Sequence, residues 1–288
     1  MDSKIEHAPL IIGFVSNLLF TSKLEDAAHR ADLDILWIGS WQELNSDELI
    51  DVLPKTDLQA GSWNVLLERV TRIRPALILF DLGNPDIPWR NWLPLLKSSP
   101  STRRLPIICF GSHVDKTQIA EAKDRGADAF FARSRMLSDA QKIFKRYADI
   151  IDTQAINRSC QQPISSLAIK GLEYFNQREY FAAHEELEFA WKADPSVGRV
   201  LYQAVLQIGV AYLQIQRKNY WGAYKMFLRV RQWIDPLPET CRGINIGKLR
   251  KDAELVYQEL LDLGPERLDE FDFSLLKPVE FRIDNINE

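Results

Sequence analysis

Five short apolar runs, each rich in β-branched or aromatic residues, recur through the first half of the chain. They occupy residues 10–16, 33–39, 76–82, 105–111 and 127–133. Runs of this length and composition are typical of strands that are buried on both faces. The segments between them carry helical spacing of apolar residues. This alternation of strand and helix predicts βαβ units and a doubly wound parallel sheet.

The pattern changes after residue 154. The segment AINRSCQQPISS (155–166) is polar and contains a proline, so it is predicted to be a linker. Beyond it, apolar residues recur with a period of about 3.6, and the last helix is predicted to stop at Gly264 and Pro265. Short connections between these helices predict antiparallel neighbours.

The predicted fold class is therefore an α/β doubly wound, flavodoxin-like parallel sheet followed by an all-α helical bundle. The expected boundaries are 1–154 for the sheet domain, 155–166 for the linker, 167–264 for the bundle and 265–288 for a C-terminal tail. The tail is acidic, and it is expected either to lie extended against the bundle or to remain loose.

Composition excludes several classes of protein. A net charge of -4 gives no general argument for binding nucleic acid or an anionic membrane. No run approaches the roughly 20 apolar residues that span a bilayer, and the apolar run near the N-terminus is too short for a signal peptide. The three cysteines are far apart without CxxC spacing, so neither a zinc site nor a disulfide framework is expected. These features predict a cytoplasmic protein.

Asp81 is the candidate functional residue of the first half. It ends the third predicted strand, and ligands of doubly wound sheets bind beyond the carboxyl ends of strands. The stretches ALILFDLGNPD, LPIICFGS and RGADAFFARS resemble the receiver domain of bacterial response regulators, and the resemblance covers roughly residues 9 to 150. It implies that Asp81 occupies the phosphoacceptor position.

The other receiver positions depart from that family's pattern. In that family, a carboxylate pair after the first strand binds Mg²⁺, and here the two positions hold Ser16 and Asn17. The position of the family's switch hydroxyl holds Gly111, with Ser112 one place late, and the position of its lysine holds Arg133. Phosphoryl transfer depends on charge neutralisation and positioning, and Mg²⁺ requires oxygen ligands. The domain is therefore expected to be a pseudo-receiver in which Asp81 has a structural role.

The helix predicted at 180–193 carries an imidazole and a carboxylate among apolar residues. At about 100° per residue, His184 and Glu188 share one side with Leu187 and three aromatic residues, Tyr180, Phe181 and Trp191. The next helix carries a second polar pair, also one turn apart, Gln203 and Gln207. Because an unpaired buried polar group costs several kcal/mol, the two pairs are expected to meet in a hydrogen-bonded network that locks the core and can line a pocket.

A second resemblance covers roughly residues 165 to 235. FNQREYFAAHEELEFAW, LYQAVLQIG and NYWGAYKMF resemble a bacterial helical family, domain-of-unknown-function family 309. The matching positions are Tyr180, His184, Glu185, Glu188, Trp191, Gln203, Gln207, Gly222 and Ala223. The resemblance implies a small helical bundle but no particular activity.

Three functions fit these observations. The favoured one is a non-catalytic signalling or adaptor protein that needs no cofactor and binds a protein partner. The second is an enzyme or ligand binder, with His184 and Glu188 as candidate metal ligands, although Glu188 stands where an HExxH motif has its second histidine. The third is a nucleic-acid-binding regulator, because residues 196–234 contain six Arg or Lys, interleaved aromatics and no acid.

Overall fold

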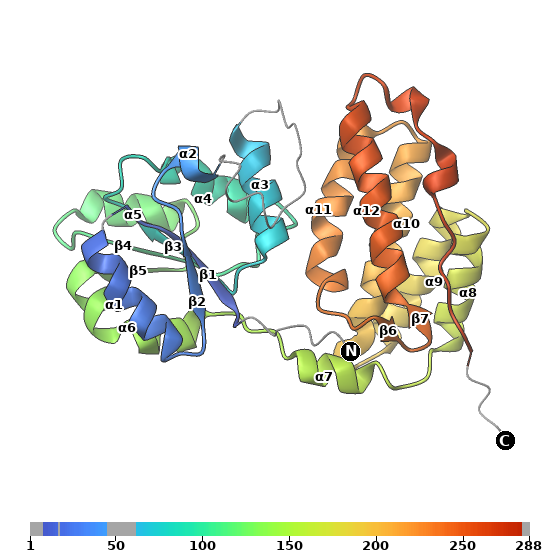
Figure 1. The fold of residues 1–288 in the computed structure, drawn as a ribbon, viewed down its shortest axis with the longest axis horizontal. Helices are drawn as coiled ribbons and strands as arrows, with labels where there is room; N and C mark the ends of the chain where they lie inside the picture. Colours follow the sequence, from blue (N-terminus) through green and yellow to red (C-terminus); the bar gives the residue numbers. More distant parts are fainter. Residues whose placement is uncertain (1–7, 17, 45–61, 284–288) are drawn as a thin grey trace. The chain divides into compact units, whose positions relative to one another are not determined.

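The computed structural model describes residues 8–16, 18–44 and 62–283. The chain divides into two compact units, Met1–Ile150 and Ile151–Glu288. Figure 1 follows the chain through both. None of the helices among the described residues combines the length and the apolar character that crossing a bilayer requires.

The first unit is built on a five-stranded sheet with the strand order β2-β1-β3-β4-β5. Every neighbouring pair is parallel. The strands are β1 (Leu10–Phe14), β2 (Asp34–Trp37), β3 (Leu77–Asp81), β4 (Ile107–Gly111) and β5 (Ala129–Ala132). The predicted doubly wound parallel sheet is confirmed. The winding reverses between β1 and β3, so the ends of these two strands form the switch point where such sheets place their ligands.

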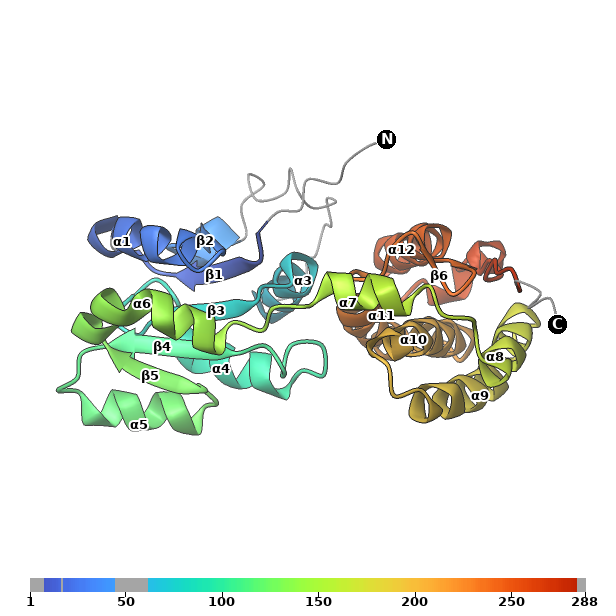
Figure 2. The ribbon, with the colours of Figure 1, turned by 90° about the horizontal axis from the view of Figure 1, so that it is seen from below.

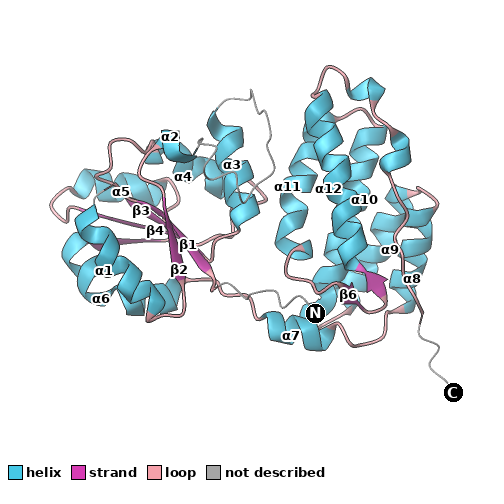
Figure 3. Ribbon diagram, in the orientation of Figure 1, coloured by secondary structure: helices cyan, strands magenta, loops and turns pink. Residues whose placement is uncertain are grey.

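Helices cover both faces of this sheet, as Figure 3 shows. They are α1 (Leu18–His29), α2 (Trp41–Leu44), α3 (Ser62–Ile73), α4 (Trp89–Ser98), α5 (Lys116–Asp124) and α6 (Arg133–Tyr147). On one face, α1 and α6 bury apolar side chains such as Leu24 and Phe144 against Ile11 and Ile108. On the other face, Trp92 of α4 meets the ring of Phe14 edge-on, with 5.2 Å between ring centroids.

The second unit is a bundle, as predicted. Its helices are α7 (Thr153–Ser159), α8 (Ser166–Asn176), α9 (Tyr180–Ala193), α10 (Val200–Gln216), α11 (Tyr220–Ile234) and α12 (Ile246–Leu263). Helices α8 to α11 each pack against the next along the chain (Figures 1 and 2). Short elements complete the unit: η2 (Val197–Arg199), β6 (Thr240–Cys241), β7 (Ile244–Asn245), η3 (Leu268–Glu270) and η4 (Phe273–Leu275).

An aromatic cluster forms the centre of the bundle. The ring of Tyr212 on α10 lies 5.7 Å from Phe175, 5.6 Å from Tyr180 and 6.4 Å from Phe227, measured between centroids. All four rings are buried. Since they come from α8, α9, α10 and α11, this cluster fixes the four helices around α10.

The segment predicted as a linker is largely ordered structure. Helix α7 begins where the Asp152 carboxylate accepts a 2.7 Å hydrogen bond from the amide of Ala155. Cys160 follows it and forms a disulfide with Cys241, which corrects the expectation that the cysteines are unpaired. The sequence carries no signal for this bond, because 81 residues separate the two sulfurs. Only the fold brings them together.

The C-terminal segment lies extended against the bundle, which was one of the two expectations. The amide of Asn245 donates to the carbonyl of Glu280, and the amide of Arg282 donates to that of Gly243, both at 2.9 Å. The side chain of Asn176 on α8 pairs with both backbone groups of Val279, at 2.7 and 3.0 Å. The last of these contacts within the described residues is that of Arg282.

Candidate functional site

Asp81 lies at the carboxyl end of β3, at the switch point of the sheet. Its side chain is almost fully buried, with 4% exposed. One carboxylate oxygen, Oδ1, accepts hydrogen bonds from the amide of Gly83 at 2.9 Å and from Nη2 of Arg133 at 3.0 Å. Asp81 is therefore a buried carboxylate that is already neutralised by a guanidinium.

Arg133 reaches Asp81 because α6 begins directly after β5. Ala132 ends the strand and Arg133 opens the helix, so its side chain starts at the carboxyl edge of the sheet. Gly83 leaves room for it, since a Cβ at that position would lie 2.1 Å from Nη2 of Arg133. The resemblance placed Arg133 where receivers have lysine; the sequence did not indicate that this arginine pairs with Asp81 or that Gly83 makes the space.

The remaining receiver positions hold no carboxylate among the described residues. Ser16 is exposed just after β1, and Asn17 lies outside the described ranges. Beside Gly111, the side-chain nitrogen Nε2 of Gln118 donates to the carbonyl of Leu82 at 3.1 Å. The hydroxyl of Ser112 accepts a 3.4 Å hydrogen bond from the amide of Val114, so it serves the local turn. Of the described receiver positions, Arg133 is the one that hydrogen-bonds to the carboxylate of Asp81.

The predicted residues of the bundle lie at the junction of α9 and α10. His184, Glu188 and Trp191 on α9 are half-buried, as are Gln203 and Gln207 on α10. Tyr180 is the member of this set that is buried, and burial raises the pKa of its hydroxyl to about 12. Glu185 is exposed. Apart from Tyr180, these residues therefore lie at the edge of the contact between α9 and α10 and not in its buried centre.

The predicted hydrogen-bonded network between α9 and α10 is not seen. Among the residues that the structure describes, no hydrogen bond joins His184 or Glu188 to the glutamines of α10, and Oε1 of Gln207 has no partner. Glu188, whose side chain is 38% exposed, pairs instead with Lys192 of the same helix at 3.1 Å. The reason is helix rotation. The buried face of α9 is centred near Ala183 and Leu187, which leaves His184 and Glu188 about 80–120° to one side.

Among the predicted residues of α9 and α10, two buried polar atoms have no hydrogen-bond partner within the described part of the chain. They are the indole Nε1 of Trp191, a donor, and the amide Oε1 of Gln207, an acceptor. The guanidinium of Arg199 lies over the Trp191 ring, 5.8 Å from its centroid. Because an unsatisfied buried polar group costs about 1–3 kcal/mol, such atoms gain from a partner that supplies the missing hydrogen bonds.

The described residues do not assemble a metal site here. No group of three or more His, Cys, Asp or Glu residues lies close enough to hold an ion in the described part of the chain. His184 and Glu188 would supply at most two ligands, fewer than the three protein ligands of a catalytic zinc.

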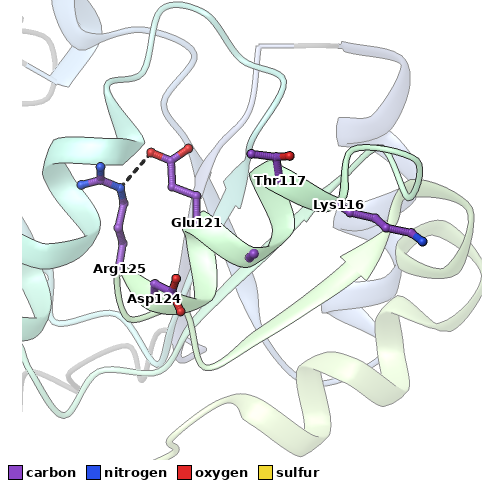
Figure 4. A pocket seen from close by; sticks show the side chains of 6 residues that line it. Lys116, Thr117, Glu121, Asp124 and Arg125 are labelled. Atoms are coloured by element: carbon purple, nitrogen blue, oxygen red, sulfur yellow. Dashed lines mark hydrogen bonds and ion pairs between the residues drawn. The ribbon is translucent and has the colours of Figure 1, made fainter.

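Figure 4 shows a shallow hollow along α5 in the first unit, lined by Lys116, Thr117, Ala120, Glu121, Asp124 and Arg125. Glu121 receives hydrogen bonds from Arg90 at 2.9 Å and from Arg125 at 3.0 Å. Desolvation opposes its ionisation, but these bonds outweigh it and lower the pKa of the carboxyl. The hollow contains none of the predicted site residues.

Comparison with known proteins agrees with the two-part organisation. The model of the family "Domain of unknown function (DUF309)" matches residues 168–226, which confirms the resemblance seen in the second half. The uncharacterized protein YpuF of Bacillus subtilis is 31% identical over 93 residues, which are 31% of this chain and 53% of YpuF. The chain thus spans about half the length of that relative.

The first half is similar to solved receiver structures. The phosphorylated cyanobacterial phytochrome response regulator RcpA is 19% identical and covers 48% of this chain and 90% of its own, with a TM-score of 0.35. A response regulator receiver domain from Rhodospirillum rubrum is 20% identical and covers 48% and 92%, with a TM-score of 0.36. At these identities the likeness concerns the fold alone.

Proposed function

We propose that this protein is a cytoplasmic, non-catalytic signalling adaptor, in which the receiver-like unit does not use a phosphoryl switch. The observation that carries the proposal is the pairing of Asp81 with Arg133 at 3.0 Å. A receiver carboxylate must be free to attack a phosphoryl donor beside a bound cation. Here a guanidinium of the same chain already neutralises it, and the position after β1 offers the hydroxyl of Ser16 instead of a carboxylate.

The bundle supplies a surface for a protein partner. Phe181 and Phe189 on the outer side of α9 are 60% and 57% exposed, which is unusual for aromatic rings. Aromatic rings are enriched in the surfaces through which proteins bind one another, and exposed apolar groups mark such surfaces. This surface supports the adaptor proposal.

The structure adds no specific support for the other two candidate functions, a metal-dependent enzyme and a nucleic-acid-binding regulator. A metal-dependent activity would need more ligands than His184 and Glu188 provide. A nucleic-acid surface would rest on exposed cations such as Arg199, Arg217 and Lys225, for which the structure records no ion pair. A steep fall of affinity with added salt is the result that would favour the nucleic-acid alternative.

The phosphoryl part is tested with small phosphodonors. The full chain is incubated with acetyl phosphate or beryllofluoride and Mg²⁺, and its mass and amide NMR spectrum are recorded. We expect no change in either. A spectral shift that disappears in Asp81→Asn would overturn the proposal that this unit works without phosphorylation.

The partner-binding part is tested by affinity capture from the source cells followed by mass spectrometry. Phe181→Ser combined with Phe189→Ser is expected to lose specific partners that the unchanged protein retains. Leu255→Ser is the matched control, because Leu255 is similarly exposed, at 59%, but lies on α12. Equal capture by all three proteins would exclude α9 as the binding surface.

A further inference from the structure

The disulfide joins two distant parts of the second unit. Cys160 caps the end of α7, and Cys241 lies in β6. Both are buried, with 3% and 0% of their surface exposed. The third cysteine, Cys109, is free but buried in β4, and burial raises the pKa of its thiol. Because the thiolate is the reactive form, Cys109 is inert, and the redox chemistry of the chain belongs to the Cys160–Cys241 pair.

Arg242, directly after Cys241, reinforces this connection. Its backbone has a φ of 51°, and its amide donates to the carbonyl of Cys160 at 2.8 Å. Its buried guanidinium donates to Asp194 at 2.6 Å, Tyr202 at 2.7 Å and Ser196 at 2.8 Å. It also reaches Ser159 and Gln162, at 3.3 and 3.2 Å. The position of the β6–β7 hairpin therefore determines whether residues 159–162 find their partners.

Helix α7 has little else to hold it. It contains seven residues, far fewer than the roughly 12–15 that a helix needs to persist alone in water. Only Ile156 and Ser159 within it are buried. Beyond the contacts of Cys160 and Arg242, the Ser159 hydroxyl accepts from the amide of Gly198 at 3.1 Å and donates to Ser196 at 2.9 Å. The disulfide is thus the strongest attachment of α7 to the bundle.

One cysteine of the pair lines a hollow on the surface of the second unit. Cys160 lines this hollow together with Gln162, Ile164, Val279 and Phe281. Cys241 is fully buried and does not line it. A thiol–disulfide exchange reaction begins with attack by a thiolate on an accessible sulfur. Because Cys160 lines the hollow and Cys241 does not, Cys160 is the better placed of the two to be attacked, with Cys241 as the leaving thiolate.

We propose that Cys160–Cys241 is a reversible redox clasp that attaches α7 and residues 160–162 to the bundle when oxidised and releases them when reduced. The reductant is a protein or small-molecule dithiol. Its first thiolate bonds to Cys160 Sγ while the Cys160–Cys241 bond breaks, and the Cys241 thiolate takes up a proton. Its second thiolate displaces Cys160 from the mixed disulfide, and the Cys160 thiolate is protonated in turn. The reductant ends as a disulfide, having supplied two electrons, and the same steps in reverse close the clasp.

The clasp is tested on the full chain equilibrated with mixtures of reduced and oxidised dithiothreitol. Alkylation after denaturation and mass spectrometry count the free thiols. Trypsin cleavage after the exposed Arg158 in α7 reports its release, and circular dichroism reports the bundle helices. On reduction we expect the alkylated thiols to rise from one to three, and cleavage after Arg158 to accelerate by at least about tenfold while the helical signal persists.

Two variants complete the test. Cys241→Ser should show fast cleavage with or without reductant, whereas Cys109→Ser should follow the unchanged protein. The proposal is overturned if three thiols are alkylated under fully oxidising conditions, or if cleavage after Arg158 is unaffected by reduction. It is overturned equally if reduction abolishes the helical signal, because the disulfide would then be a global staple rather than a local clasp.

Discussion

The pairing of Asp81 with Arg133 shows how one residue can change the character of a site without changing its fold. A lysine is a compact charge on a flexible stem, whereas a guanidinium is planar, always charged and forms directed hydrogen bonds. Arg133 donates one such bond to a carboxylate that is almost fully buried. In this structure the charge of Asp81 is therefore balanced by a cation of the same chain.

Removing this arginine should leave an uncompensated buried carboxylate. We expect Arg133→Met to lower the free energy of unfolding of the first unit by about 1–3 kcal/mol. This is less than the loss for a fully buried pair, because the arginine side chain is 39% exposed. Urea unfolding measures the change. Adding Asp81→Asn should recover part of the loss, since a neutral amide needs no counter-charge.

Arg135→Met is the matched control for this prediction. Arg135 lies two residues further along α6, is 66% exposed and pairs with Asp139 at 3.7 Å. Its loss should cost no more than about 0.5 kcal/mol. If Arg133→Met and Arg135→Met behave alike, the Asp81–Arg133 pair does not stabilise the site.

The half-exposed Glu188 gives a second prediction for single residues. Its one recorded partner is Lys192, one turn away on the same helix. Pairs of this kind contribute about 0.3–0.5 kcal/mol, so Glu188→Ala should destabilise the bundle only slightly, and Lys192→Ala by a similar amount. Thermal unfolding of both variants and their combination gives the coupling. A loss above about 1 kcal/mol for Glu188→Ala would instead indicate that Glu188 belongs to a buried hydrogen-bonded network, as the sequence predicts.

The placement of elements could be predicted from sequence more completely than the contacts between side chains. The position of Asp81 at the end of a strand is predictable, because a short apolar run followed by a polar residue is typical of a buried strand and its end. The polar pair on α9 was assigned to the core because Tyr180, Leu187 and Trp191 flank it. Helical spacing, however, defines a face only to within a fraction of a turn, and the neighbouring helices set the final rotation.

Two features of the second unit could not be predicted for a different reason. Helix α7 is short and mostly exposed, so its sequence has the polar composition of a linker. The disulfide joins residues whose separation carries no pattern. Both depend on tertiary contacts of Arg242, a residue that stands in an ordinary turn sequence, CRGIN, with nothing to show that its guanidinium is buried.

The contact between α8 and α9 depends on a glycine. A Cβ at Gly171 would lie 2.7 Å from Cγ of Leu187 and 3.2 Å from the backbone nitrogen of the same residue. Gly171→Ala should therefore push the helices apart and destabilise the bundle by about 1–3 kcal/mol, despite the better helix propensity of alanine. Chemical denaturation of the variant measures this loss.

A double variant separates this steric effect from other causes. Leu187→Ala alone leaves a cavity and is also destabilising. Combined with Gly171→Ala, it removes the side-chain part of the clash, so the two losses should sum to more than the loss in the double variant. Strictly additive losses would show that Gly171 and Leu187 do not limit the approach of the helices.

At the scale of the whole molecule, each unit has its own core, and the change of fold class coincides with the division at Ile150. The sheet unit keeps a receiver-like architecture around a neutralised carboxylate. The helical unit begins with α7, which the disulfide and Arg242 attach to the rest of the bundle, and its C-terminal segment packs against the β6–β7 hairpin and α8. We therefore expect residues 151–288 to fold as an independent unit whose first helix contributes to its stability.

This expectation is tested by two fragments, 151–288 and 162–288, compared by thermal and urea unfolding. Both should melt cooperatively with a helical signal. The shorter one lacks α7 and Cys160, so it loses the disulfide and two partners of Arg242, Ser159 and the carbonyl of Cys160. We expect it to be less stable by about 2–5 kcal/mol, the usual effect of losing a native disulfide. Cys160→Ser in the longer fragment removes the bond but keeps α7, and it should lie between the two. Equal stability of both fragments would show that residues 151–161 do not contribute to the bundle, in agreement with the linker that the sequence predicts at 155–166.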